Sequence, residues 1–255
     1  MLVGVAQRPH EVHIVWNKAP SDISLEPGCV HVFRVALDLS RLNLGKFRAV
    51  LAADESERAA RFHFEQGRDN YVVARGVLRM LLGDYLKLEP SAVRLTYSAH
   101  GKPALSADHA SDLQFNLSHS GSLALIAFTR GARIGVDIER IRPEFDGQRI
   151  ADRFFTETEA AALRACPDSL RTRRFARQWT RKESFIKAHG EGLSYPLNAF
   201  SVLESSADAL EIAISGKTGV SDWCVRDLDV DEAYAAALSV ESPGCSLETM
   251  SWPRG

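Results

Sequence analysis

The sequence predicts an α+β fold made of two similar halves, and three observations lead to this prediction. Hydrophobic residues make up 45% and charged residues 25% of the 255 residues, as in globular proteins of one large domain or two smaller ones. Short apolar–polar alternations, typical of strands, are interspersed with segments of helical periodicity. Each half also has the order short helix, long arginine-rich helix, strands, which indicates a duplication. We therefore expect subdomains at residues 1–132 and 133–255, with a ligand cleft between them.

The first half is expected to contain two strands, two helices and then a strand-rich stretch. Alternating sequences predict strands over residues 11–16 and 31–37. A helix is predicted from Asp54, because Glu57 completes a capping-box pattern three residues later. Apolar residues at helical spacing predict a second, longer helix over residues 68–88.

The rest of the chain continues this alternation of strands and helices. Further strands are predicted over residues 93–98, 115–119, 122–129 and 134–140. In the second half Thr156 is the predicted N-cap of a helix, with Glu159 as its box partner, and a long helix over residues 170–189 ends at Gly190. The tail is predicted to form short strands over residues 200–204, 210–215, 223–228 and 233–240.

Composition excludes several classes of protein. The net charge of −2 leaves no large electrostatic footprint for nucleic acid. The longest apolar runs, such as residues 123–128, are too short to span a bilayer, and the N-terminus has no signal-peptide pattern. The four cysteines form no CxxC pair, so their spacing indicates neither a zinc site nor a disulfide framework. We expect a cytoplasmic protein that binds neither nucleic acid nor membranes.

The stretch IGVDIER, residues 134–140, places two carboxylates in a predicted buried strand. Because side chains alternate between the two faces of a strand, Gly135, Asp137 and Glu139 share one face. Two like charges about 7 Å apart repel each other unless a positive group lies between them. The strand is therefore either the edge of a sheet facing water or part of a metal site.

The helix sequence WTRKESFIK offers a third carboxylate. Trp179, Glu183 and Lys187 are spaced four residues apart and share one helical face. A surface Glu–Lys pair at this spacing contributes only about 0.2–0.5 kcal/mol, but the tryptophan favours a packed face or a cleft. If Glu183 joined Asp137 and Glu139, the three acids would form an all-oxygen site suited to Mg²⁺. Sequence spacing does not establish that this helix meets the strand.

Three further features could bind phosphate, each with a simpler structural explanation. Lys102 lies in the turn HGKPAL, which presents its ammonium but is also an ordinary hairpin signal. Ser118 and His119 in FNLSHS are neighbours on a strand, so they point to opposite faces and do not form a nucleophile–base pair. The first long helix carries a basic stripe, either a solvated flank or an anion site, formed by Arg68, Arg75 and Arg79.

Taken in order, GKP, FNLSHS, IGVDIE and WTRKESFIK resemble the 4′-phosphopantetheinyl transferase superfamily, specifically its larger Sfp-type members. The resemblance covers about residues 55–201. Residues 134–139 match every position of the family's (V/I)G(I/V)D(I/V)E strand, and residues 179–187 match every position of its W(S/T)xKE(A/S)xxK helix. The small trimeric members have about half this chain length, so the resemblance implies a monomer whose two mostly antiparallel halves are related by a pseudo-twofold axis.

The resemblance implies a function and a metal site. Sfp-type enzymes transfer the 4′-phosphopantetheine group of coenzyme A to a serine of an apo carrier protein and release 3′,5′-ADP. This is the reaction of holo-[acyl-carrier-protein] synthase. Coenzyme A lies in the cleft between the halves, with Mg²⁺ (or alternatively Mn²⁺) bound by the pyrophosphate and by residues equivalent to Asp137, Glu139 and Glu183. Gly135 would leave room beside these acids.

The resemblance also implies roles for individual residues. Glu183, directly or through a water, would accept the proton of the carrier serine, and Lys187 would contact the phosphates. Lys182 would anchor the helix. The remaining residues implied to contact coenzyme A are Arg58, Arg61, Arg75, Lys102, Pro103, Ser118 and His119.

The expected macromolecular partners are the acidic carrier proteins of fatty-acid, polyketide or nonribosomal-peptide biosynthesis. The arginines between Arg164 and Arg181 are one possible docking surface for them. Two rival functions remain open. A Mg²⁺-dependent phosphodiesterase or pyrophosphatase acting on coenzyme A-like substrates would use the same acids without a carrier. A catalytically silent carrier-binding module would share the fold but transfer nothing.

Overall fold

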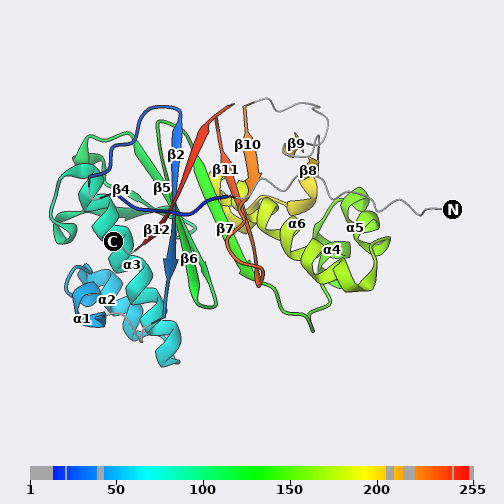
Figure 1. Cartoon of the computed structure of the whole chain (residues 1–255), viewed down its shortest axis with the longest axis horizontal. Coiled ribbons are helices and arrows are strands. Elements are labelled where there is room, and N and C mark those ends of the chain that lie inside the picture. The colour runs from blue at the N-terminus through cyan, green and yellow to red at the C-terminus, as the bar shows by residue number, and fades with distance from the viewer. Residues whose placement is uncertain are drawn as a thin grey trace.

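The computed structural model describes residues 14–20, 22–38, 43–204, 210–214, 222–242 and 244–252. Two five-stranded sheets lie next to each other, and a long helix packs on each of them, α3 on the first and α6 on the second (Figure 1). The predicted α+β class and the recurrence of a long helix with a sheet in both halves are confirmed. No helix of the described part of the chain combines the length and the apolar character needed to cross a membrane.

The first sheet contains strands from both ends of the sequence. Its order is β1-β12-β2-β6-β5, and its strands are β1 (Asn17–Lys18), β12 (Ser246–Trp252), β2 (Cys29–Ala36), β6 (Leu123–Arg130) and β5 (Leu113–Ser120). β12 pairs in parallel with β1 and β2, whereas β6 pairs antiparallel with β2 and β5. The last strand of the chain thus lies in the sheet of the first half, although the expected boundary assigns it to the second; the boundary itself stays a prediction. Of the strand predicted over residues 11–16, residues 11–13 lie outside the described residues and 14–16 form no strand.

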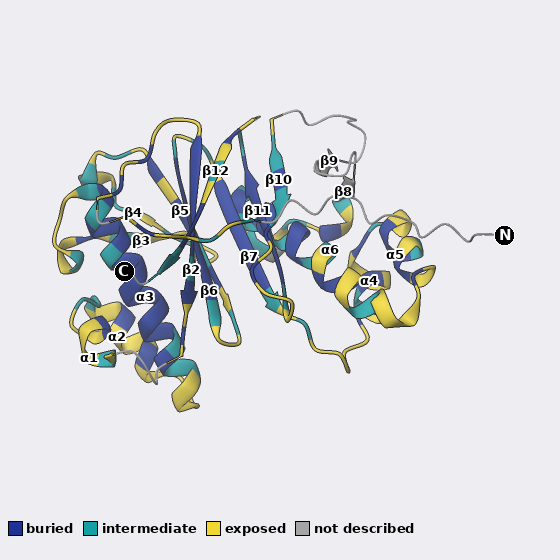
Figure 2. Cartoon of the chain, in the orientation of Figure 1, coloured by how far each residue is buried: buried dark blue, intermediate teal, exposed yellow. Residues whose placement is uncertain are grey.

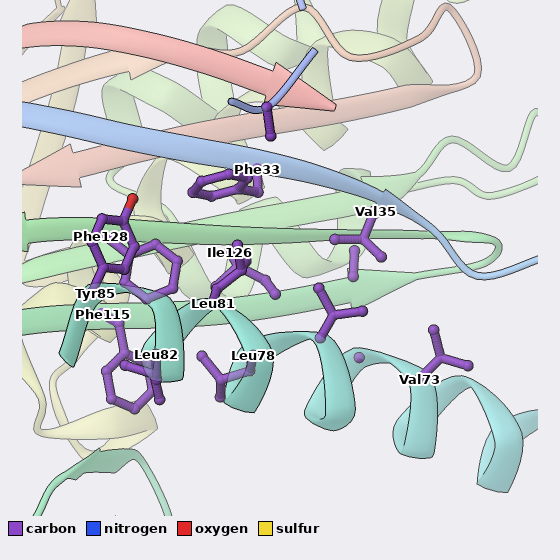
Figure 3. Close-up of a cluster of buried hydrophobic side chains, with 14 of the residues drawn as sticks. Phe33, Val35, Val73, Leu78, Leu81, Leu82, Tyr85, Phe115, Ile126 and Phe128 are labelled. Atoms are coloured by element: carbon purple, nitrogen blue, oxygen red, sulfur yellow. The ribbon is translucent and has the colours of Figure 1, made fainter. Parts of the chain in front are cut away.

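Helix α3 (Glu65–Leu86) packs its apolar face on the first sheet. Leu78, Leu81 and Leu82 of the helix meet Phe33 and Phe128 of the strands in a buried cluster (Figure 3). Two shorter helices, α1 (Leu44–Arg48) and α2 (Ala53–Ala60), precede it, and a hairpin of β3 (Leu95–Tyr97) and β4 (Pro103–Leu105) follows.

The start of α2 differs from the prediction. The helix begins at Ala53, and the carboxylate that caps it belongs to Glu55, whose Oε2 accepts a hydrogen bond from the Ala52 backbone N–H at 3.0 Å. The box predicted between Asp54 and Glu57 is therefore wrong. Glu55 is buried, whereas both predicted residues are exposed. The capping acid is thus the buried one, which the sequence pattern alone did not identify.

The second sheet is antiparallel throughout. Its order is β7-β11-β10-β9-β8, and its strands are β7 (Ile134–Arg140), β11 (Tyr234–Val240), β10 (Cys224–Asp227), β9 (Leu210–Ile214) and β8 (Phe200–Glu204). Its helices are α4 (Gln148–Phe154), α5 (Glu157–Arg164) and α6 (Asp168–His189). Thr156 and Glu159 form the predicted capping box of α5, and α6 ends as predicted at Gly190, whose φ of 90° is left-handed. Short 3₁₀ turns lie at Pro90–Ala92, Ala107–His109, Gly192–Ser194 and Leu197–Ala199.

Side chains of β5 join the two sheets where β5 and β7 meet. Asn116 Oδ1 accepts a hydrogen bond from the Val136 backbone N–H at 2.9 Å. The hydroxyl of Ser118, two residues further along β5, donates to Oδ1 of Asp137, the residue after Val136, also at 2.9 Å. Because the alternate residues of a strand share a face, FNLSHS presents a polar row to β7. This row is the seam between the two halves, and most of β7 is buried beneath its neighbours (Figure 2).

Candidate functional site

A hollow of about 390 Å³ opens beside the seam and is lined by side chains from β5, β7 and α6. The lining residues are Leu117, Ser118, His119, Asp137, Glu139, Trp179, Glu183 and Lys187. Helix α6 thus meets strand β7, which sequence spacing could not establish. Seven of the residues singled out from the sequence come together here: Ser118, His119, Asp137, Glu139, Trp179, Glu183 and Lys187.

Asp137 lies at the centre of the hydrogen bonding in this hollow. It is buried, and its Oδ1 accepts hydrogen bonds from Lys187 Nζ at 2.6 Å and from the Ser118 hydroxyl. Its other oxygen, Oδ2, is buried and has no hydrogen-bond partner among the described residues. A buried carboxylate oxygen without a partner is costly, so this atom is available for a ligand.

The other two acids are held in an environment that disfavours their charge. Burial, followed by the negative charges of Asp137 and Glu139, raises the pKa of Glu183 to about 7, although Lys187 opposes the shift. Burial and the charge of Asp137 also raise the pKa of Glu139. A cation among the three carboxylates would relieve this repulsion. The all-oxygen donor set and the unpaired Asp137 Oδ2 therefore fit a hard divalent cation such as Mg²⁺.

Ser120 is a site residue that the sequence reasoning missed. Its hydroxyl accepts a hydrogen bond from the Arg140 backbone N–H at 3.0 Å and donates one to Glu139 Oε2 at 2.9 Å. Both hydrogen-bonding roles of the hydroxyl are used, so it fixes Glu139 relative to the backbone of its own strand. The signal was present in the sequence: Ser118 and Ser120 are two residues apart, as are Asp137 and Glu139.

The expectation that Gly135 leaves room beside the acids is wrong. A Cβ atom at this position would lie 2.0 Å from the Ser184 carbonyl oxygen and 2.4 Å from the Ala188 backbone nitrogen. Both atoms belong to α6. The missing side chain therefore allows the helix to pack directly on β7, which brings Glu183 to the strand.

Lys102 lies beside the end of α6 and not among the lining residues. Its ammonium donates to the carbonyl oxygens of Ile134 and Lys187 and so joins the first-half hairpin to β7 and α6. Burial first, and then the charges of Arg133 and Lys187, lower the pKa of Lys102 to about 8. Pro103 is half-buried at the start of β4. Neither residue contributes to the hollow as it stands.

Two arginines of helix α3 have protein partners. Arg75 is buried, its Nε lies 3.2 Å from Glu55 Oε1, and its Nη2 donates to the Tyr97 hydroxyl at 2.7 Å. Arg79 is buried against the same glutamate. These two residues of the basic stripe are therefore buried partners of an acid of the same chain. They form neither a solvated flank nor a preformed anion site.

Arg58 and Arg61 are exposed, and neither is a lining residue of the hollow. The Arg58 guanidinium lies over the ring of Tyr71 at 5.7 Å. Arg61 caps the end of α2.

Lys182 has the anchoring position expected of it. Its Nζ is fully buried, lies 2.8 Å from Glu159 Oε2 and donates to the carbonyl oxygens of Leu197 and Phe200. The hydrogen bonds connect α6 to α5 and to the segment that leads into β8. Lys182 therefore fixes the helix that carries Glu183 through contacts outside the hollow.

The hollow gathers three carboxylates and an ammonium at the seam between the two sheets, and titratable groups with shifted pKa values in a concave site are typical of an enzyme. Residues 133–239 match the 4′-phosphopantetheinyl transferase superfamily, and residues 40–130 match the 4′-phosphopantetheinyl transferase N-terminal family. The chain belongs to the 4′-phosphopantetheinyl transferase superfamily. The predicted family and transferase class are confirmed.

Several relatives are similar over most of their length. The 4′-phosphopantetheinyl transferase HetI of Nostoc is 37% identical over 90% of this chain and 94% of its own. Sfp of Bacillus subtilis is 30% identical over 80% of this chain and 88% of its own. The solved holo-[acyl-carrier-protein] synthase of Thermotoga maritima covers 43% of this chain and 62% of its own, at 22% identity and a TM-score of 0.35. The first two relatives establish the Sfp type.

Proposed function

We propose that this chain transfers 4′-phosphopantetheine from coenzyme A to a serine hydroxyl of an apo carrier protein and releases 3′,5′-ADP, with a divalent cation held by Asp137, Glu139 and Glu183. The observation that carries the proposal is the meeting of these three carboxylates in one hollow, where the buried Asp137 Oδ2 has no partner among the described residues. Mg²⁺ fits this oxygen set, with Mn²⁺ as the alternative ion. When bound, the ion would neutralise charge on the pyrophosphate.

The protein's own residues supply the remaining chemistry. Lys187 places its ammonium against Asp137 at the wall of the hollow, where it can also neutralise charge developing on a transferred phosphoryl group. Glu183 lines the hollow, where it can take up the proton of the carrier serine, directly or through a water. Ser118 orients Asp137, and Ser120 orients Glu139.

Coenzyme A contacts are proposed for His119 in the hollow and for Lys102 and Arg75 outside it. His119 is exposed on β5 and lines the hollow, in a position to meet a phosphate. Lys102 already donates to two backbone carbonyls, so a phosphate contact requires the exchange of one of these hydrogen bonds. Arg75 would similarly have to share its guanidinium with Glu55. The contacts of Pro103, Arg58 and Arg61 are proposed from the resemblance alone.

We propose a carrier protein of fatty-acid, polyketide or nonribosomal-peptide biosynthesis as the acceptor, and a monomer acting in the cytoplasm. Several arginines expected to dock the carrier are engaged with acids of the same chain. Arg177 and Arg181 both pair with Asp227, and Arg164 pairs with Asp152 and Glu157. These pairs reduce the positive charge that this region offers to an acidic partner.

The test incubates the purified chain with coenzyme A, Mg²⁺ and apo carriers of the three pathways, and weighs each carrier by mass spectrometry. The expected result is the mass gain of one phosphopantetheine, lost on chelation and in Glu183→Gln. Glu57→Gln, at an exposed position of α2, is the matched control and should retain activity. Breakdown of coenzyme A without a carrier would establish the hydrolase instead. Binding of coenzyme A without transfer to any carrier would establish the silent module.

A further inference from the structure

A second group of metal-type side chains lies in the first sheet. Cys29 and His31 belong to β2, and Glu248 belongs to β12. One ligand-type atom from each, the thiol sulfur, an imidazole nitrogen and a carboxylate oxygen, lies within 4.8 Å of the other two. We propose that Cys29, His31 and Glu248 bind a borderline-soft divalent metal ion of the Zn²⁺ class.

The sheet register brings the three side chains together. Cys29 and His31 are two residues apart on β2 and therefore share a face. Glu248 is the direct partner of His31 in the parallel pairing of β12 with β2. The backbone positions of all three residues are thus set by the strand pairing before any ion binds. The spacing of the cysteines could not predict this arrangement, because the carboxylate comes from a strand more than 200 residues further along the chain.

The imidazole of His31 is held as a metal-ligating histidine usually is. Its Nδ1 lies 2.7 Å from the Tyr85 hydroxyl, and its Nε2 lies 3.4 Å from Glu248 Oε2. When Nδ1 carries the proton and donates it to Tyr85, the lone pair of Nε2 points to the side of Glu248. A hydrogen bond from the second ring nitrogen to an oxygen is the usual outer support of a metal-bound histidine.

The donor set and the geometry suit Zn²⁺ better than Mg²⁺. Tetrahedral Zn²⁺ with sulfur, nitrogen and oxygen ligands places neighbouring ligand atoms about 3.5 Å apart. The contact between His31 and Glu248 already has this length, so the Cys29 sulfur has to move by at most about 1.3 Å. A thiolate and an imidazole favour softer ions than the all-oxygen hollow does. Cys29 and His31 are buried, whereas the Glu248 side chain is 64% exposed and leaves a path for the ion.

An ion at this position would connect two distant parts of the sequence. It would bridge β2 to β12, the strand by which the end of the chain joins the first sheet. Because a ligand that binds the folded state alone stabilises it, the ion should raise the temperature of unfolding. The site is separate from the acid hollow, whose lining residues are a different set.

The test titrates the chelator-treated full-length protein with Co²⁺ and follows its absorption. Binding at the proposed site gives one equivalent of Co²⁺ with a thiolate-to-metal charge-transfer band, which Zn²⁺ then displaces. Co²⁺ in the acid hollow gives no such band, because no cysteine is among its described lining residues. The band should vanish in Cys29→Ser. Cys166→Ser, at a buried cysteine outside the cluster, should keep it.

Two further variants keep the result unambiguous. Cys224 and Cys245 lie in side-chain contact and could also supply thiolates, so Cys224→Ser must retain the band. Glu248→Gln changes an exposed side chain, leaves the fold intact and should weaken Co²⁺ binding about tenfold or more. Zn²⁺ should raise the unfolding temperature of the native protein but not that of Cys29→Ser. Absence of the band, its persistence in Cys29→Ser or its loss in Cys224→Ser would overturn the proposal.

Discussion

Replacing Gly135 by alanine tests how closely β7 must approach α6. The new Cβ would lie 2.0 Å from the Ser184 carbonyl oxygen, whereas ordinary van der Waals contact begins at 3.4 Å. The helix and the strand therefore have to separate by about 1.4 Å at this point. All three close contacts of the new atom are with backbone atoms of Ser184 and Ala188, so no rotation of a side chain can remove the clash. We expect Gly135→Ala to lower the free energy of unfolding by about 3 kcal/mol, the upper end of the usual cost of overpacking.

The same displacement reaches the site directly. Glu183 precedes Ser184, and Lys187 precedes Ala188, so the carbon atom pushes on the turns of α6 that carry both side chains. A shift of this size would stretch the contact between Lys187 Nζ and Asp137 Oδ1 from 2.6 Å to about 4 Å, beyond hydrogen-bond length. A misplacement of about 1 Å can cost roughly 100-fold in rate. We expect a loss of transfer activity of at least this size.

Urea denaturation and the rate of transfer to an apo carrier measure the two effects. The matched control is Gly67→Ala in α3, where the new Cβ would be 3.3 Å from the flexible side chain of Phe62. An alanine inside a helix is favoured over glycine by about 1 kcal/mol, so this variant should keep or gain stability and remain active. A Gly135→Ala protein with native stability and native rate would refute the close contact between β7 and α6.

Three other changes probe the site and its support. Ser120→Ala should weaken Mn²⁺ binding, measured by titration calorimetry, about tenfold because Glu139 loses its orienting hydroxyl, whereas Ser120→Thr should restore it. In the metal-free protein, folding raises the pKa of Glu183 from 4.5 to about 7, so the folded state binds the proton more tightly than the unfolded state. The resulting contribution to the free energy of unfolding is full below about pH 4.5 and is lost as the pH rises through about 7. Urea titrations across this range should show that decline flattened in Glu183→Gln, and an unchanged slope would contradict the raised pKa. Lys182→Met leaves Glu159 buried without its cation and should cost about 3–5 kcal/mol in the same assay, with part of the loss recovered when Glu159→Gln is added.

Local patterns predicted well which of the candidate side chains share one face of an element. The period of a strand placed Asp137 and Glu139 on one face, and the period of a helix placed Glu183 with Lys187. The structure has each pair as expected, because these relations depend only on the backbone of one element. The contact between the two elements could not be predicted from the sequence, since it depends on how α6 crosses β7. The misread role of Gly135 follows from this, because a glycine that admits a helix and one that admits an ion give the same local signal.

The basic residues were harder to predict, because a cation can serve the fold or a ligand. Arg75 and Lys102 were expected at phosphates, yet one is paired with Glu55 and the other holds two backbone carbonyls. A buried guanidinium is costly without an acid partner, but no sequence pattern tells which distant acid will supply it. Their proposed phosphate contacts stay predictions.

The charge balance of the hollow supports the proposal that a divalent cation binds there. Three carboxylates line it, and among the described lining residues Lys187 alone is a formal cation, which leaves a charge of about −2 when all three acids are ionised. The seam does not offset this charge, because the hydroxyls of Ser118 and Ser120 orient the acids without neutralising them. Burial, together with this uncompensated negative charge, therefore raises the pKa values of Glu139 and Glu183. The repulsion among the acids lowers the stability of the folded state. An ion of charge +2 would remove the repulsion that raises these pKa values, so its binding would restore part of that stability.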